Sequence, residues 1–418
     1  MTTVDTSEID LVDRSLYRDG VPHDVFAELR ARGAVHRHRP AQILPGGPEI
    51  EFWSVVRHAE IQQANRDWQT FTATRGVVIE PAPPQRAGDM LVSMDPPDHT
   101  RLRRLISAGF TPRMIGKLEA HIADRTRRIL DAAAEQRDCD FVRDIAYQLP
   151  MHVIADIVGI PEEDRPQIFT CTDAVLRGFV PESGLTDADR FEAAAELFRY
   201  AHELTDLRRR EPADDVWTLI AHARIEDEDG NVTTVEGIEL ETFFMILSIA
   251  GSETTRNALS QGLLALLDHP DQLDDLRAHP EALPSATEEI IRWASPALFF
   301  ARTATRTTEL GGVTIEEGDR VVLWYPSGNR DERVFEDPFR FDVRRDPNPH
   351  VSFGGGGPHH CLGANLARKE IEVMVGQLIE RFDVECIGPP VWLNAGPAHN
   401  VGVSVDALPV RLTERSLC

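Results

Sequence analysis

Residues 352–364 read SFGGGGPHHCLGA, a run of glycines followed shortly by Cys361. Glycine lets a backbone turn sharply and pass close to a flat or bulky group. The next residues, ANLARKEIEVMVGQLIERF from Ala364, have the apolar spacing of a helix. A helix N-terminus stabilises a nearby thiolate through its dipole and its free N–H groups. The sequence therefore predicts a low-pKa thiolate at Cys361.

The residues alone leave several interpretations of Cys361 open. A merely buried cysteine would not need the glycine run. Zinc ligation by His359, His360 and Cys361 would need a further ligand, and no cluster of suitable spacing supplies one. A nucleophilic thiol would need a base that the sequence does not mark. A thiolate bound to haem iron accounts for the glycines, the cysteine and the helix together.

The loop resembles the haem-binding loop of the cytochrome P450 family, whose pattern is FGxGx(H/R)xCxG. The matching residues are Gly357, His359, Cys361 and Gly363. One spacing differs, because Phe353 stands eight residues before Cys361 where the family commonly has seven. Some bacterial members that oxidise lipids and steroids have a similar spacing. The resemblance implies that Cys361 binds the iron of haem b and that Phe353, Gly355 and Gly363 contact the haem.

A second motif, Glu289-Ile290-Ile291-Arg292, resembles the family's ExxR pair. An acid and a base three residues apart are common on solvated helix faces, so the pair alone indicates little. With Arg340 in FEDPFRF (335–341), it resembles a buried charge triad of the family. Such a network is expected to be structural, because breaking a buried ion pair costs roughly 3–5 kcal/mol.

A third motif lies in a long apolar segment, 236–267, which has no proline and is predicted to be one buried helix. Its centre reads AGSETT, residues 250–255. Glycine, an acid and two threonines all weaken a helix, and such breaches of local preference in a core suggest function. The resemblance implies that Gly251, Glu253 and Thr254 are catalytic, with Thr254 hydrogen-bonding dioxygen and Glu253 relaying protons.

A fourth set of residues could neutralise the two haem propionates. His99 and Arg103 follow Asp95-Pro96-Pro97 and, at i and i+4, share one face of a predicted helix. Arg302 and His359 match other propionate positions of the family. Each alone would be an ordinary surface charge, but together they form a consistent set of cations for two carboxylates.

The composition limits the cellular compartment and the binding partners that we expect for this chain. The chain has 418 residues and a formal net charge of -25. That charge repels nucleic acid and anionic membrane surfaces. The five cysteines are scattered, and the acidic N-terminus lacks the features of a signal peptide. We therefore expect a soluble cytoplasmic protein without a membrane span.

The predicted fold is mainly α with small β-sheets (α+β), as one P450 domain over 1–418. Its helix-rich core covers about 90–385, with strands near 301–325 and 391–412. The resemblance places the haem between the long helix and the helix after the cysteine. A Pro-rich segment, 80–88, is either a connector or a lid. Segment 225–232 is expected to be a hairpin or exposed loop.

The resemblance implies a monooxygenase that hydroxylates a C–H bond with O₂ and two electrons. We expect a separate ferredoxin and an NAD(P)H-dependent reductase as donors, with a basic dock for the ferredoxin or merely scattered charges at Arg101, Arg104, Arg113, Lys117, Arg368 and Lys369. The expected substrate is a hydrophobic sterol, branched lipid or terpenoid, as in actinobacterial sterol and methyl-branched lipid hydroxylases. The alternatives are a macrolide or other polyketide hydroxylase or epoxidase, and a non-catalytic haem-thiolate sensor. Predicted substrate-lining residues are Val78, Leu91, Leu176, Met245, Ala250, Leu298, Phe299 and Val401.

Overall fold

The computed structural model describes residues 9–43, 46–82, 88, 90–107, 112–178, 180, 183–226, 232–235, 237–394 and 396–415. Its α-helices are α1 (His23–Arg32), α2 (His58–Arg66), α3 (Asp98–Ser107), α4 (Pro112–Gln136), α5 (Gln148–Val158), α6 (Arg165–Arg177), α7 (Asp187–Arg210), α8 (Val216–Ala221), α9 (Ile238–Asp268), α10 (Pro270–Ala278), α11 (Leu283–Ala294), α12 (Tyr325–Gly328) and α13 (Ala364–Arg381). Shorter helical turns are η1 (Arg14–Tyr17), η3 (Leu91–Ser93), η5 (Phe141–Ala146), η7 (Pro280–Ala282) and η8 (Gly396–Ala398).

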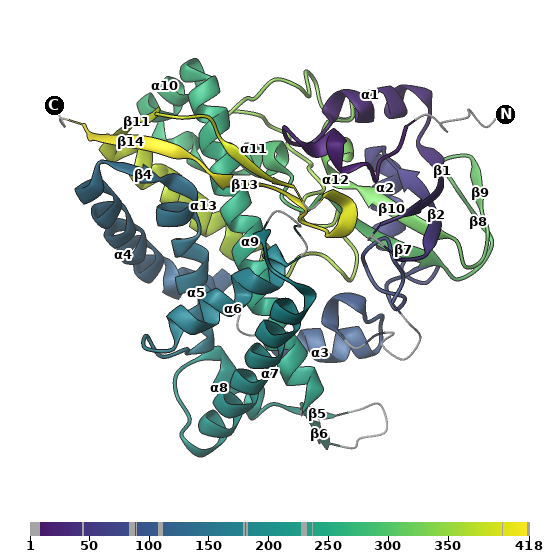
Figure 1. Ribbon diagram of the computed structural model, residues 1–418, viewed down its shortest axis with the longest axis horizontal. Coiled ribbons are helices and arrows are strands. Elements are labelled where there is room, and N and C mark those ends of the chain that lie inside the picture. The colour runs from purple at the N-terminus through teal and green to yellow at the C-terminus, as the bar shows by residue number, and fades with distance from the viewer. Residues whose placement is uncertain are drawn as a thin grey trace.

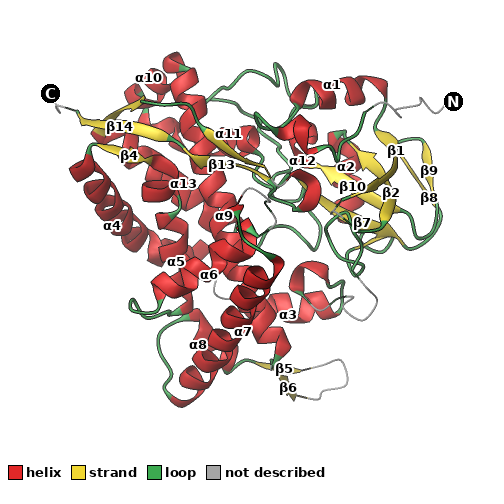
Figure 2. Ribbon diagram, viewed as in Figure 1, coloured by secondary structure: helices red, strands yellow, loops and turns green. Residues whose placement is uncertain are grey.

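The strands are β1 (Val35–Gln42), β2 (Glu49–Val55), β3 (Phe71–Thr72), β4 (Asp138–Asp140), β5 (Arg224–Glu226), β6 (Val232–Thr234), β7 (Phe299–Ala304), β8 (Thr308–Leu310), β9 (Val313–Ile315), β10 (Arg320–Trp324), β11 (Phe382–Cys386), β12 (Val391–Asn394), β13 (Val403–Ala407) and β14 (Pro409–Glu414). The largest sheet has the order β1-β2-β10-β7-β3, and β11-β14-β4 form a second one. Figure 2 shows most helices on one side of the molecule and the larger sheet on the other, with α1, α2 and α12 beside that sheet. The predicted mainly α fold with small sheets is confirmed.

Helix α9 crosses the middle of the helical half (Figure 1). Its 31 residues make it about 46 Å long, and they coincide closely with the predicted segment 236–267. Leu240, Phe244 and Leu263 are buried in the largest hydrophobic core, so tertiary packing holds a helix that contains poor helix formers. None of the described helices is both long and apolar enough to cross a bilayer.

The larger sheet takes three strands, β1, β2 and β3, from a region where the sequence predicted none. Strand β1 reads VHRHRPAQ and pairs antiparallel with β2, which in turn pairs parallel with β10. Basic residues and a proline hide the alternating pattern in β1, so the expectation of strands only late in the chain was incomplete. The predicted hairpin exists as β5 and β6, but its turn, 227–231, and most of the Pro-rich segment 80–88 lie outside the described residues.

Candidate active site

The loop before α13 holds Cys361 by its backbone. The Cys361 N–H donates to the carbonyl oxygen of Phe353 at 3.0 Å, and the N–H of Gly363 donates to the sulfur. The Cys361 side chain is exposed, yet burial raises the pKa of its thiol above the usual value, against the opposing charges of Arg103 and Arg368. The sulfur therefore faces a hollow inside the protein rather than open solvent.

That shift corrects the prediction of a low thiol pKa at Cys361. The N–H of Gly363 does support the thiolate, as the helix argument requires, but loss of hydration outweighs it. A bound iron would remove the thiol proton outright, so a raised pKa without metal is compatible with thiolate ligation. Gly363 has nothing within 4 Å of an added Cβ, which leaves open space beside the sulfur.

The glycine run packs against α2. Gly354–Gly357 all have positive φ, from 63° to 108°. A Cβ on Gly357 would lie 2.5 Å from the carbonyl oxygen of Asn65, and one on Gly355 would lie 3.1 Å from the Gln62 side chain. These left-handed conformations accommodate the additional loop residue while the chain presses on a neighbouring backbone. Gly355 therefore packs on α2, and its contact with haem stays a prediction.

Three of the four predicted propionate cations are buried together. The rings of His99 and His359 have centroids 4.5 Å apart, and Arg302 is 3 % exposed. Arg302 donates to neutral oxygens only, those of Ala301 and Asn65. The fourth cation is Arg103 on α3, whose guanidinium donates to the carbonyl oxygen of His360 at 2.5 Å.

The cluster lacks enough negative charge for its cations. Burial, with the charges of His359 and Arg103, lowers the pKa of His99 to about 4. The Nδ1 atom of His99 is buried and has no hydrogen-bond partner in the described structure. Asp95 is the acid close to the cluster, 3.4 Å from His359 Nε2. An unpartnered buried nitrogen among several cations fits a group with two carboxylates, as haem b has.

Helix α9 faces the hollow with two residues of its central motif, Ala250 and Thr254. Ala250 is exposed although it lies in the middle of the molecule, and the Thr254 hydroxyl donates to the Ala250 carbonyl at 2.9 Å. Gly251 does not face this space, because a Cβ there would lie 2.8 Å from the Ile154 side chain on α5. The absence of a side chain at Gly251 thus lets α5 pack closely on α9, and its catalytic role stays a prediction.

Glu253 points into the core behind Thr254. It is 3 % exposed and forms an ion pair with Arg256, one turn along α9. Burial raises the pKa of Glu253, although the charge and hydrogen bond of Arg256 oppose the rise. Glu253 is therefore a buried carboxyl held one residue from the Thr254 hydroxyl.

Comparison with known proteins shows the family to which the chain belongs. The family model Cytochrome P450 matches residues 185–394. A steroid C26-monooxygenase of Rhodococcus jostii is 38% identical over 93% of this chain and 82% of its own length. A methyl-branched lipid omega-hydroxylase of Mycobacterium bovis is 39% identical over 92% of this chain and 90% of its own length.

This chain is a cytochrome P450. A solved Mycobacterium marinum cytochrome P450, in complex with pseudoionone, superimposes with a TM-score of 0.87 at 36% identity, covering 98% of each chain. The protein is accordingly a haem b monooxygenase, an oxidoreductase. Its relatives hydroxylate steroids and methyl-branched lipids, as their names state.

The ExxR pair of this P450 is buried as predicted, but its third member is a different arginine. Arg292 donates to both carboxylate oxygens of Glu289 at 2.7 Å, and both side chains are 0% exposed. Arg345 completes the triad, with Nε 3.1 Å from Glu289 Oε2. The side chain of Arg340 is exposed, and only its carbonyl oxygen takes part, by accepting from Arg292 and Arg345. The prediction of Arg340 was therefore wrong.

The predicted substrate-lining residues divide into two groups. Ala250 is exposed toward the interior, and a further set is partly exposed: Val78, Leu176, Met245 and Val401. Phe299 is fully buried and packs on Trp324 with ring centroids 5.3 Å apart, so its predicted place in the lining is wrong. Leu298 and Leu91 are also buried within hydrophobic cores. Neighbouring strand residues point to opposite faces, which the sequence alone could not orient.

Asn400 is a residue of this P450 that sequence reasoning missed. Its side-chain amide donates to the backbone carbonyls of Val77 at 3.0 Å and Phe299 at 2.8 Å. Its backbone carbonyl accepts from the Leu298 N–H at 2.6 Å. It thus joins three segments predicted to line the substrate site. No motif marks it, because the three segments are far apart in sequence.

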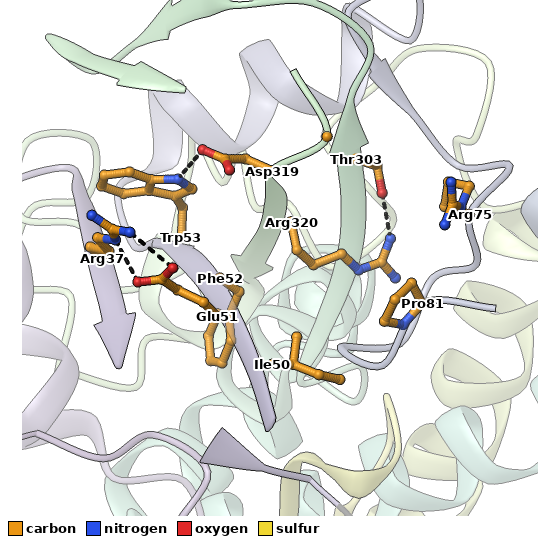
Figure 3. A pocket seen from close by; sticks show the side chains of 11 residues that line it. Arg37, Ile50, Glu51, Phe52, Trp53, Arg75, Pro81, Thr303, Asp319 and Arg320 are labelled. Atoms are coloured by element: carbon orange, nitrogen blue, oxygen red, sulfur yellow. Dashed lines mark hydrogen bonds and ion pairs between the residues drawn. The ribbon is translucent and has the colours of Figure 1, made fainter. Parts of the chain in front are cut away.

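Arg320 fixes one of these segments from the other side of the sheet. Its guanidinium donates to the carbonyls of Gly76, Val78 and Ile79. Figure 3 shows it pointing toward Thr303 in a surface pocket of about 240 Å³. None of the residues predicted to bind haem or substrate lines that pocket, so it is separate from the active site.

Glu370 is a second residue that the sequence did not indicate. It lies on α13, is 1% exposed, contacts the Thr255 hydroxyl and has no hydrogen-bond partner for Oε1 among the described residues. Burial raises the pKa of Glu370 to about 8. Glu370 therefore stores a proton at neutral pH beside the catalytic segment of α9.

This raised pKa predicts a specific pH dependence of stability. The folded protein binds the Glu370 proton more tightly than the unfolded chain, so its contribution is full below about pH 4.3 and is lost as pH rises to about 8. Glu370→Gln should remove this part of the slope and stabilise the protein most at pH 8. Urea unfolding across pH 5–8 measures it, with Glu372→Gln, on the same helix, as control. Equal slopes for the wild type and Glu370→Gln would contradict the assignment.

Proposed function

We propose that this P450 hydroxylates an unactivated C–H bond of a sterol or methyl-branched lipid, using electrons from a separate ferredoxin and its reductase. The observation that carries the proposal is the pair of exposed Ala250 and partly exposed Thr254, which faces an interior space with partly exposed apolar side chains. The 38–39% identity to a steroid and a methyl-branched lipid hydroxylase supports the substrate class. An apolar pocket with few polar groups suits such a molecule.

Haem b, when bound, supplies the O₂ and C–H chemistry. Cys361 would hold the iron through its thiolate, while His99, Arg103, Arg302 and His359 would hold the propionates. The Thr254 hydroxyl donates to the Ala250 carbonyl and keeps its capacity to accept, so it would hold a proton-donating water beside the reacting oxygen. Glu253 would return protons to this site, with Arg256 keeping its carboxyl in place.

A ligand panel tests the substrate class. Titration of the ferric holoenzyme with a sterol, a methyl-branched fatty acid, a terpenoid and a macrolide precursor should displace water from the iron and shift the absorption spectrum. We expect the sterol or branched acid to bind most tightly and to give a hydroxylated product with ferredoxin, reductase and NAD(P)H. A shift with the macrolide precursor alone would overturn the proposal.

Thr254→Ala should separate electron consumption from hydroxylation. Loss of the hydroxyl removes a group that positions protons, a contribution of about 10²-fold in general acid–base catalysis. Product per NAD(P)H should therefore fall steeply, with peroxide released instead. Thr242→Ala is the matched control, because Thr242 makes the same hydrogen bond to a carbonyl four residues earlier, at 2.6 Å, on the same helix. Unchanged coupling in Thr254→Ala would remove the assigned role.

Three of the cations predicted to bind an acidic ferredoxin already form ion pairs within the protein. Arg101 pairs with Glu239, Arg368 with Glu288, and Lys369 with Glu119. Arg104 is exposed on α3, and no ion pair joins it to another described residue. The side chains at positions 113 and 117 lie outside the described residues. We therefore infer that Arg104 contributes more to docking than Arg368 does.

Arg104→Glu should slow reduction of the haem by ferredoxin about tenfold at low salt. The difference should shrink as ionic strength rises, because exposed charges are screened. Stopped-flow reduction at several salt concentrations measures this effect. Arg210→Glu, an equal change at the end of α7, should leave the rate unchanged. A salt-independent loss in Arg104→Glu would indicate a folding defect rather than docking.

A further inference from the structure

A charged cluster lies beneath the cysteine loop and joins three elements. Arg368 on α13 donates to both carboxylate oxygens of Glu288 on α11, at 2.5 and 3.1 Å. His350, in the chain before the loop, lies 3.0 Å from the same carboxylate through Nε2. Its side chain is only 3% exposed. Glu288 therefore holds a buried imidazole and a guanidinium at once.

The cluster also contacts Phe353, the residue that carries the cysteine backbone. The guanidinium carbon of Arg368 lies 4.5 Å from the centre of the Phe353 ring, within cation–π range. His350 packs on the same ring with centroids 5.6 Å apart. Because the Phe353 carbonyl accepts from Cys361 N–H at 3.0 Å, the cluster supports the residue that holds the ligand.

Its charges also act on the cysteine. Arg368 lies in the second turn of α13, and its guanidinium rests on the Phe353 ring, so a positive charge stands beside the cysteine loop. Glu288 neutralises Arg368 from the side away from the ring. Burial alone would raise the pKa of Glu288, but hydrogen bonds from His350 and then Arg368, together with their charges, lower it to about 2. Glu288 therefore stays charged at neutral pH.

We propose that Glu288, His350 and Arg368 form a unit that positions Phe353 and sets how much positive charge the Cys361 thiolate experiences. This inference rests on the proposed ligation of iron by Cys361 and adds residues that do not touch the haem. Arg368 is thereby a positioning residue of the ligand loop, which explains why it is a poor docking cation.

The test compares reduction potentials of the holoenzyme in variants of opposite charge change. A cation stabilises the reduced, more negative site, so Glu288→Gln should raise the potential and Arg368→Gln should lower it. The double variant should return close to the wild type. A cluster that merely holds the loop together would shift both single variants in the same direction.

Arg368→Lys separates charge from geometry. Lysine keeps the positive charge but lacks the planar fork that binds Glu288 at two points. We expect its potential to stay near the wild-type value, while its reduced, CO-bound form loses the thiolate-type Soret band faster on warming. If Glu288→Gln fails to retain haem, Arg368→Gln and Arg368→Lys still decide the question.

An ion pair of the same geometry provides the control. Arg344 donates to Asp275 at 2.5 and 2.8 Å on the surface, away from the cysteine loop. Asp275→Asn should change neither potential nor band stability. Shifts of equal sign in Glu288→Gln and Arg368→Gln, or no shift in either, would overturn the inference. Absence of a thiolate-type spectrum in the wild type would instead refute ligation by Cys361 itself.

Discussion

Replacing Cys361 with alanine is expected to abolish the red-shifted Soret band of the reduced, CO-bound protein and all O₂-dependent hydroxylation. The physical reason is that the sulfur of Cys361 faces the interior hollow and alone would donate a thiolate to the iron. Electron donation from the thiolate to the iron favours O–O cleavage in this family. His99 and Arg302 could still retain some haem, but without that electron donation.

Spectra of the purified variant and product analysis with ferredoxin, reductase and NADPH measure the effect. Cys139→Ala is the matched control: Cys139 is a buried thiol whose pKa burial raises to about 11, far from the cysteine loop in β4. It should leave spectrum and activity unchanged. A thiolate-type band in Cys361→Ala would place the ligand elsewhere and overturn the assignment of the site.

Replacing Glu289 with glutamine should lower the free energy of unfolding by about 3–5 kcal/mol, the usual cost of breaking a buried ion pair. The carboxylate accepts from Arg292, Arg345, Asn348 and the Asp342 N–H. Its loss strands the guanidinium of Arg292, which is 0% exposed. Chemical unfolding of the holoenzyme, followed by circular dichroism, measures the change.

Two arginine variants test which residue completes this triad. Arg345→Gln should destabilise the protein by about 1–3 kcal/mol, because a charged hydrogen bond to Glu289 is lost. Arg340→Gln should change stability by less than about 0.5 kcal/mol, since its side chain is exposed and only its backbone takes part. The reverse order of the two effects would restore Arg340 as the third member.

Local patterns were sufficient to predict the elements that carry the chemistry. The glycine-rich loop with Cys361 indicated a metal-bound thiolate, and the uninterrupted apolar run 236–267 gave α9 to within two residues at its start. Both signals depend on neighbours in the chain, through helix periodicity and glycine conformation. Helix spacing joined His99 to Arg103, but family resemblance alone joined them to Arg302 and His359, because no local pattern links these distant positions.

Other features depended on contacts between distant segments. Arg345 rather than Arg340 reaches Glu289 because the backbone path after α11 decides which side chain turns inward. Phe299 packs on Trp324 because strand pairing sets which face each residue takes. No local sequence pattern indicates which arginine reaches Glu289 or which face of the sheet Phe299 takes.

The sequence by itself determined the family and the central helix, and it marked Cys361 as the predicted iron ligand, because these signals come from neighbouring residues. Only the tertiary structure revealed Glu370 beside Thr255, Asn400 between three segments, and the Glu288–Arg368–His350 cluster beneath Phe353. These groups owe their properties to burial and to partners tens or hundreds of residues away. Desolvation and long-range pairing arise only when the chain is folded.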